Sequence, residues 1–154
     1  ALDDIKFGYL TIHGQGGKEM IEKAKKAASE IYSRPKIMMV TILTALNDDD
    51  LKAIGNNSTV NEQVKKLAEV AKEMNVGIIC SGLEAKIVRK IIGQDLLIFT
   101  PGIRMQNDSK DDQNRICSPI DSIKNGSDKI IMGRSLIKGN IEENLNQVAE
   151  SIKT

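Results

Sequence analysis

The alternation of short apolar runs with amphipathic stretches constrains this chain most. Five runs are brief, rich in Ile, Val and Leu, and apolar on consecutive residues, which is typical of strands covered on both faces of a parallel sheet. We expect these strands at residues 9–13, 37–43, 76–80, 96–99 and 129–132.

Helical patterns lie between the strands, with apolar residues three or four positions apart. We expect helices at residues 17–32, 61–74, 82–92, 119–124 and 141–152, with Asn61 as the N-cap of the second. Two polar stretches, 47–58 and 104–115, are expected to be loops, the second a weakly ordered lid when no ligand is bound. Strand–helix alternation indicates right-handed βαβ units and an α/β fold.

The length of 154 residues suits one domain, which we expect to span residues 1–154. A complete (β/α)8 barrel needs about 250 residues, or roughly 30 for each unit, so this chain has room for about five units. Two architectures therefore agree with the pattern: an open five-stranded sheet, and five-eighths of a barrel.

Composition excludes several classes of protein. Lys and Arg total 22 and Asp and Glu total 21, so no strong field attracts nucleic acid or a membrane surface. One histidine, with Cys80 and Cys117 well separated, disfavours a metal centre or a disulfide framework. We expect reduced thiols, no cofactor and a cytoplasmic location, because neither a signal peptide nor a membrane-spanning run is visible. Since residue 1 is Ala, we also expect a trimmed N-terminus or a piece of a longer protein.

The ends of the last two strands carry the strongest binding signal. Gly102 and Arg104 follow the fourth strand, and Gly133 and Arg134 follow the fifth. Glycine lets the backbone approach an anion, and arginine adds a bidentate charge. Barrels commonly bind phosphate in the loops after strands seven and eight. If these are strands four to eight, Arg104 and Arg134 share one anion site.

The other strand ends are less informative. Residues 13–17 superficially resemble a dinucleotide-binding motif, but the third glycine comes too early and no acidic residue ends the next strand. We interpret His13 as a hydrogen-bonded core residue. Cys80 and Ser81 have no neighbouring base and are poor candidates for a nucleophile. Thr44 either caps a turn or contacts a ligand.

Taken in order, these strand ends resemble the bacterial orotidine 5'-monophosphate decarboxylase family over essentially the whole chain. The most specific part is Thr-Pro-Gly-Ile-Arg at 100–104, followed by Asp-Gln-Asn-Arg at 112–115 and Gly-Arg at 133–134. Further matching stretches are 10–13 with Gly16 and Gly17, 40–44, 79–81 with Glu84, and 126–128. The resemblance implies the C-terminal part of a TIM barrel, with about five βα units equivalent to strands four to eight.

The resemblance also implies roles for five residues. Arg104 would end the phosphate-binding strand, and Gln113 would lie in a loop that closes over a nucleotide phosphate. Gly133 and Arg134 would hold that phosphate, and Thr44 would contact the pyrimidine. The implied ligand is an orotidine or uridine monophosphate, in UMP biosynthesis and without a cofactor. Ala45 stands where the family usually has Ser, which removes a polar group beside the base.

The family's catalytic stretch, Asp-x-Lys-x-x-Asp-Ile-Pro on its third strand, has no counterpart here. Asp4-Ile5-Lys6 lacks the second Asp, and Tyr9 stands in its place. We therefore expect no catalytic residue in this chain and no activity from it alone. It would be one portion of a decarboxylase or, alternatively, a non-catalytic, self-associating module that binds phosphate esters. A sugar-phosphate epimerase is disfavoured by the Gln113 loop. Two open sheet edges predict a homodimer or a complex with a separate N-terminal piece.

Overall fold

The computed structural model describes residues 5–106, 108–109 and 111–153, and its centre is a five-stranded parallel sheet. Asp4 of the Asp4-Ile5-Lys6 stretch lies outside the described residues, as do residues 107 and 110 of the expected lid. The strands are β1 (Tyr9–His13), β2 (Lys36–Val40), β3 (Gly77–Ile79), β4 (Ile98–Thr100) and β5 (Lys129–Ile130). All five predicted strands are confirmed, although β2 to β5 are shorter than expected; β2 also starts one residue earlier than predicted, and β4 ends one residue later.

The helices alternate with the strands as predicted. They are α1 (Gly17–Glu30), α2 (Asp48–Ala53), α3 (Val60–Glu73), α4 (Ala85–Ile92), α5 (Pro119–Lys124), α6 (Arg134–Ile137) and α7 (Ile141–Ser151), with a 3-10 turn η1 (Gly14–Gly16) after β1. Within the described residues, none of these helices has the length and hydropathy that a bilayer crossing demands.

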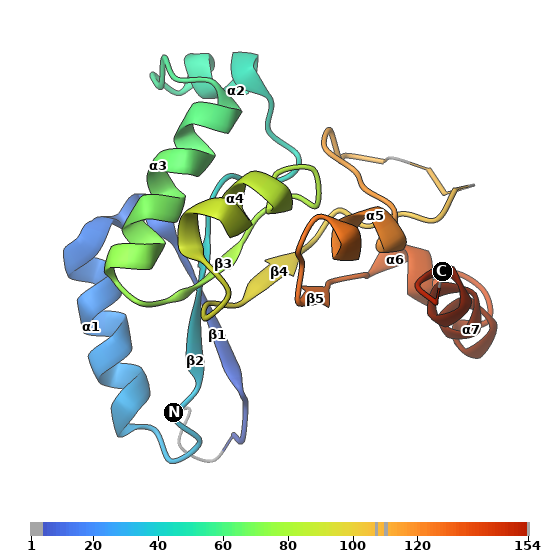
Figure 1. The fold of residues 1–154 in the computed structure, drawn as a ribbon, viewed down its shortest axis with the longest axis horizontal. Coiled ribbons are helices and arrows are strands. Elements are labelled where there is room, and N and C mark those ends of the chain that lie inside the picture. Colours follow the sequence, from blue (N-terminus) through green and yellow to red (C-terminus); the bar gives the residue numbers. More distant parts are fainter. Residues whose placement is uncertain (1–4, 107, 110, 154) are drawn as a thin grey trace.

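The strand order decides between the two expected architectures. Each strand pairs in parallel with the next one in the chain, in the order β1-β2-β3-β4-β5 (Figure 1). A doubly wound sheet reverses direction at a switch point, whereas a barrel adds each strand beside the previous one. Right-handed crossovers then place every helix on the same side. The α/β fold of five parallel βα units is therefore of the barrel type.

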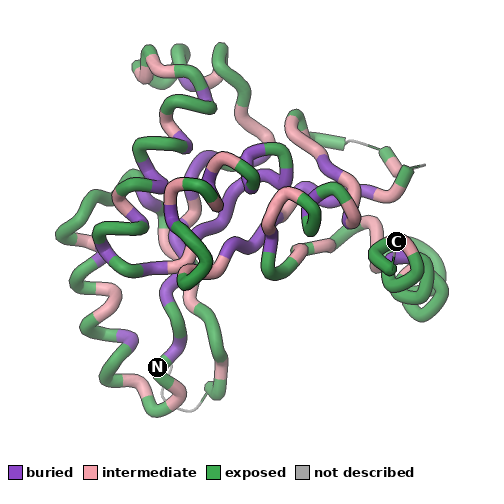
Figure 2. The backbone as a smooth tube through the Cα atoms, viewed as in Figure 1, coloured by how far each residue is buried: buried purple, intermediate pink, exposed green. Residues whose placement is uncertain are grey.

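The main core lies between the sheet and helices α1, α3 and α4. Ile37 and Met39 of β2 face these helices, together with Ile78 and Ile98 of the neighbouring strands. A smaller cluster lies on the opposite face of the sheet and contains Met38, Ile79 and Phe99. The ring of Tyr9 meets Phe99 edge-on, with 4.8 Å between the ring centroids. Figure 2 shows burial concentrated in the central strands.

Strand β1 differs from the expectation of burial on both faces. Leu10 and Ile12 pack against the main core, but Tyr9, Thr11 and His13 are exposed. The physical reason is that β1 is an edge strand, and the inner face of the sheet is covered only in part. The interpretation of His13 as a core residue is therefore wrong.

Short helices account for the other differences. The expected loop at 47–58 contains α2, whose N-cap Asn47 forms a capping box with Asp50. Helix α2 buries only Leu51, so it has no apolar period to detect. The N-cap of α3 is Thr59, which forms a capping box with Glu62, so the assignment of Asn61 as the cap is wrong.

Candidate functional site

The loops that follow the strands gather at the carboxyl edge of the sheet, because all five strands run in parallel. There the loop after β4 extends back to the tip of β2. The backbone N–H groups of Asn114 and Arg115 both donate to the carbonyl oxygen of Thr44, each at 3.1 Å. Residues distant in sequence thus form one surface at the end where parallel α/β proteins bind ligands.

Arg104 and Arg134 line one cavity at this edge, as predicted from their positions after the last two strands. The cavity has a volume of about 310 Å³. Its lining residues are Arg104, Asp108, Ser109, Asp111, Arg134, Ser135, Ile137 and Lys138. Arg104 is buried, whereas the side chain of Arg134 is 50% exposed. The cavity therefore combines a fixed guanidinium with an accessible one.

Carboxylates of the loop after β4 occupy the space beside these guanidinium groups. Asp111 lies 3.8 Å from Arg104 Nη2 and 3.4 Å from Arg134 Nη1. Arg134 also donates a hydrogen bond to Asp112. That bond from Arg134, with a further one from Gln113, lowers the pKa of Asp112. Arg104 and Arg134, which are predicted to hold a phosphate, are thus already paired with carboxylate anions.

Arg104 itself is held in place by backbone carbonyl groups. Its Nε donates to Ser109 O at 3.1 Å, and its Nη1 donates to Ile103 O at 3.0 Å. These bonds fix the plane of the guanidinium and leave Nη2 directed towards Asp111. A fixed donor costs little conformational entropy when a ligand binds.

Thr44 and Gln113, predicted to lie near the pyrimidine and the phosphate, are brought together directly. The buried hydroxyl of Thr44 donates to the side-chain carbonyl of Gln113. Neither residue lines the cavity of Arg104 and Arg134. Four of the five predicted site residues therefore form two pairs, Arg104 with Arg134 and Thr44 with Gln113, and the loop after β4 contributes to both. The fifth, Gly133, does not line the cavity and directly precedes Arg134 in the chain.

The two predicted glycines differ in their surroundings. Gly102 has a φ of 73°, and a Cβ atom there would lie 3.0 Å from the carbonyl oxygen of Arg115. Only glycine fits this turn without strain. Gly133 precedes α6, and its carbonyl oxygen accepts hydrogen bonds from the amides of Leu136 and Ile137.

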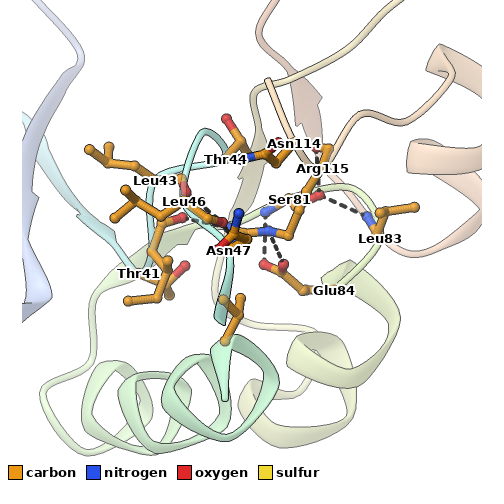
Figure 3. A network of polar contacts seen from close by, with 12 residues as sticks. Thr41, Leu43, Thr44, Leu46, Asn47, Ser81, Leu83, Glu84, Asn114 and Arg115 are labelled. Atoms are coloured by element: carbon orange, nitrogen blue, oxygen red, sulfur yellow. Dashed lines mark hydrogen bonds and ion pairs between the residues drawn. The ribbon is translucent and has the colours of Figure 1, made fainter. Parts of the chain in front are cut away.

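Arg115 and Glu84 form a buried ion pair whose role the sequence did not indicate (Figure 3). Arg115 Nε lies 2.7 Å from Glu84 Oε1, close enough for an ion pair but not aligned for a hydrogen bond. Burial raises the pKa of the Glu84 carboxyl, and Arg115 opposes that effect. An available signal was the single acidic residue in the otherwise apolar or small stretch 76–85.

Cys80 and Ser81 have the surroundings expected of structural residues. Burial raises the pKa of the Cys80 thiol, which keeps the sulfur protonated. The Ser81 hydroxyl donates to Arg115 O and accepts from the amide of Leu83, both at 3.2 Å. Among residues 5–106, 108–109 and 111–153, no three His, Cys, Asp or Glu side chains are grouped to hold a metal ion.

Known proteins resemble this chain in sequence. The orotidine 5'-phosphate decarboxylase / HUMPS family model matches residues 4–149. The orotidine 5'-phosphate decarboxylase of Trichlorobacter lovleyi is 42% identical over 131 residues, which cover 82% of this chain and 54% of that protein. The Lactobacillus gasseri enzyme of the same name is 41% identical over 142 residues, covering 88% of this chain and 60% of that protein. The chain thus spans little more than half the length of these curated relatives.

Solved structures resemble it in fold. The crystal structure of orotidine 5'-phosphate decarboxylase from Lactobacillus acidophilus matches with a TM-score of 0.81 and 30% identity, covering 99% of this chain and 66% of that one. The decarboxylase from Pyrococcus horikoshii OT3 shares the fold, with a TM-score of 0.70 at 22% identity, over 96% of this chain and 62% of that one. The resemblance and the partial-barrel fold are confirmed, and the chain belongs to the orotidine 5'-phosphate decarboxylase / HUMPS family.

Proposed function

We propose that residues 1–154 form one domain that supplies the phosphate-binding part of a nucleotide monophosphate site. The protein would resemble orotidine 5'-phosphate decarboxylase and would act in UMP biosynthesis in the cytoplasm. The observation that carries this proposal is the shared cavity of Arg104 and Arg134 at the carboxyl edge of the sheet. Gln113 belongs to the loop whose residues Asp108, Ser109 and Asp111 line this cavity, and it accepts a hydrogen bond from Thr44.

The chemistry of the cavity favours a dianion over a neutral ligand. Two guanidinium groups and Lys138 line it, and Asp111 and Asp112 already pair with the arginines. A phosphate ester carries more charge than either carboxylate, and it accepts bidentate hydrogen bonds from arginine. We therefore assign Arg134 to direct phosphate contact and Arg104 to the fixed side of the site, with the Gly133 backbone beside them.

The pyrimidine side of the ligand is assigned to Thr44. Its hydroxyl contacts Gln113, and its carbonyl oxygen holds the end of the same loop. A ligand that brought a base to Thr44 and a phosphate to Arg134 would close this loop against both. Ala45 leaves one polar group fewer for the base than the family pattern has, so phosphate contributes a larger share of the affinity.

Decarboxylation itself requires groups beyond these. The stretch Asp-x-Lys-x-x-Asp, with which the family provides its proton donor and its carboxylate, occurs nowhere in the 154 residues. General acid chemistry needs a group within hydrogen-bond reach of the reacting carbon. We propose that a further segment or a separate chain supplies it, and that the 154-residue chain alone shows no enzymatic turnover of orotidine monophosphate. A steady-state assay on mass-verified protein tests this, and robust turnover would contradict it.

Titration calorimetry with UMP and with inorganic phosphate tests the binding site. Arg134→Ala should weaken both affinities by about tenfold or more, because a hydrogen bond to a charged group contributes roughly 1.5–3 kcal/mol. Lys26→Ala is the matched control, since it removes one positive charge from the exposed face of α1. Equal affinities for Arg134→Ala and the control would contradict the assignment.

A second candidate function is a non-catalytic module that binds phosphate esters and associates with itself. The observation that favours it is a set of exposed apolar side chains on the last two helices, α6 and α7. Ile137, Ile141 and Leu145 are 67%, 52% and 49% exposed. A homodimer or a complex with a separate N-terminal piece would cover this surface. Turnover on adding such a piece favours the enzyme, and a stable inactive homodimer favours the module.

A further inference from the structure

The Arg115–Glu84 ion pair does not line the cavity of Arg104 and Arg134. Both of its charged side chains are largely buried. The side chains of Arg115 and Glu84 are 14% and 4% exposed. Desolvating two charges costs more than their attraction returns unless further hydrogen bonds satisfy the remaining donors and acceptors. The other partners of these two side chains therefore show what the pair holds in place.

The remaining donors of Arg115 all reach the segment that follows β2. Its Nη1 donates to Leu46 O at 2.6 Å, and its Nη2 donates to Ile42 O at 2.9 Å and to Leu43 O at 3.2 Å. Thr44 lies within this segment, and its carbonyl oxygen accepts from the Arg115 backbone amide. One residue thus binds the backbone on both sides of Thr44.

Glu84 fixes the same guanidinium from the turn after β3. Its second carboxylate oxygen accepts from the Ser81 amide at 3.1 Å, and the Ser81 hydroxyl donates to Arg115 O at 3.2 Å. Figure 3 shows Arg115 between the carbonyl groups of the β2 tip and the Glu84 carboxylate. Three segments from separate βα units are therefore joined at one side chain.

We propose that Arg115 is a positioning residue that couples the phosphate loop to the pyrimidine side of the site, and that Glu84 orients it. This inference rests on the proposed function of the site. Gln113 is two residues before Arg115 and contacts Thr44, so Gln113 and Thr44 cannot move independently while Arg115 is held. A ligand that engages both groups then orders them together, and its phosphate and base bind cooperatively.

Lysine cannot replace Arg115 in this role. The guanidinium presents a planar array of donors that reaches three carbonyl oxygens and a carboxylate at once. An ammonium group is a single compact charge and cannot span these acceptors. Arg115→Lys therefore keeps the charge and removes the coupling, which separates positioning from simple electrostatic attraction of a phosphate.

The first experiment compares UMP with inorganic phosphate in calorimetric titrations of the wild type, Arg115→Lys, Glu84→Gln and Lys26→Ala. In both site variants we expect the UMP affinity to fall by about tenfold, the usual scale of a coupling between two sites. The phosphate affinity should change by less than about twofold, because Arg104 and Arg134 are untouched. Equal losses for the two ligands, or wild-type UMP affinity in Arg115→Lys, would overturn the proposal.

The second experiment needs no ligand and separates this inference from the proposed function. In Arg115→Lys, the backbone amides of residues 114 and 115 should lose protection from hydrogen exchange, because both amides donate to Thr44 O in the wild type. Protection at Ile78 and Cys80 in β3 and just after it reports whether the variant is folded. If Arg115→Lys does not fold, Glu84→Gln takes its place, since it keeps the shape and one acceptor of the side chain. Wild-type protection at Asn114 and Arg115 in a folded variant would overturn the coupling even if no nucleotide binds.

Discussion

Arg134 is paired with Asp112, a residue of the loop that would have to close over a bound phosphate. The pair is solvent-exposed, and the hydrogen bond from Arg134 lowers the pKa of Asp112. The carboxylate is therefore ionised at neutral pH and competes with any anion for the same guanidinium.

This competition predicts that Asp112→Asn binds inorganic phosphate more tightly than the wild type. We expect a gain of about two- to fivefold, the size that exposed ion pairs support. Asp49→Asn is the matched control, because Asp49 is an exposed aspartate paired with Lys52 on α2. An unchanged or lower phosphate affinity in Asp112→Asn, measured by titration calorimetry, would contradict the competition.

The buried Arg115–Glu84 pair predicts a large loss of stability when one partner is removed. Arg115→Ala leaves Glu84 charged, buried and without its ion-pair partner, which typically costs about 3–5 kcal/mol. Urea unfolding followed by circular dichroism measures the free energy of unfolding. The control Lys26→Ala should stay within about 0.5 kcal/mol of the wild type. A loss for Arg115→Ala no greater than that of the control would show that the pair does not hold the loops.

Glu84 also predicts a pH dependence of stability. Burial raises the pKa of its carboxyl, so the folded chain binds this proton more readily than the unfolded chain does. The contribution to stability is full below the unfolded pKa of about 4.3 and is lost as pH rises through the raised folded value.

Glu84→Gln cannot titrate at this position and isolates the effect. The difference in unfolding free energy between the wild type and Glu84→Gln should therefore become less favourable to the wild type as pH rises above about 4.3. Urea unfolding series at several pH values measure it. A difference that is flat with pH, or that grows in favour of the wild type, would contradict the raised pKa.

The open edges of the sheet predict that the chain is not a monomer. Tyr9 is exposed on the edge strand β1, and the apolar side chains of Ile141 and Leu145 are exposed on α7. Stable monomers rarely leave such an apolar surface in water, and an unprotected edge strand pairs readily with another chain.

Light scattering at micromolar concentration measures the assembly directly. We expect the wild type to have a mass above the 16.9 kDa of one chain. Leu145→Lys on α7 should shift the population towards the single chain of 16.9 kDa. Lys26→Ala is again the control, because it alters a different helix. A monodisperse, cooperatively folding wild-type particle of 16.9 kDa would contradict the prediction.

The sequence predicted the fold well wherever apolar residues are periodic. The strands and the long helices α1, α3 and α7 were visible because each buries a regular set of side chains. Helices α2 and α6 were missed because α2 buries only Leu51 and α6 buries no residue, so neither shows an apolar period. Whether His13 is exposed depends on which strands flank β1, and the residues of β1 itself do not contain that information.

The candidate site was predictable only in part. Arg104 and Arg134 could be placed together because parallel strands end at one edge, so position in the chain implies proximity. Glu84 and Arg115 could not be paired in this way. They lie in loops of different βα units, and their contact depends on how the loop after β4 folds back to Thr44.

A crystal structure of the chain grown with UMP tests the central claim most directly. We predict the phosphate in the cavity lined by Arg104 and Arg134, within hydrogen-bond distance of Arg134, with Asp112 displaced from that guanidinium. Gln113 should remain in contact with Thr44. A phosphate bound elsewhere, with the Arg134–Asp112 pair intact in the presence of saturating UMP, would contradict the account.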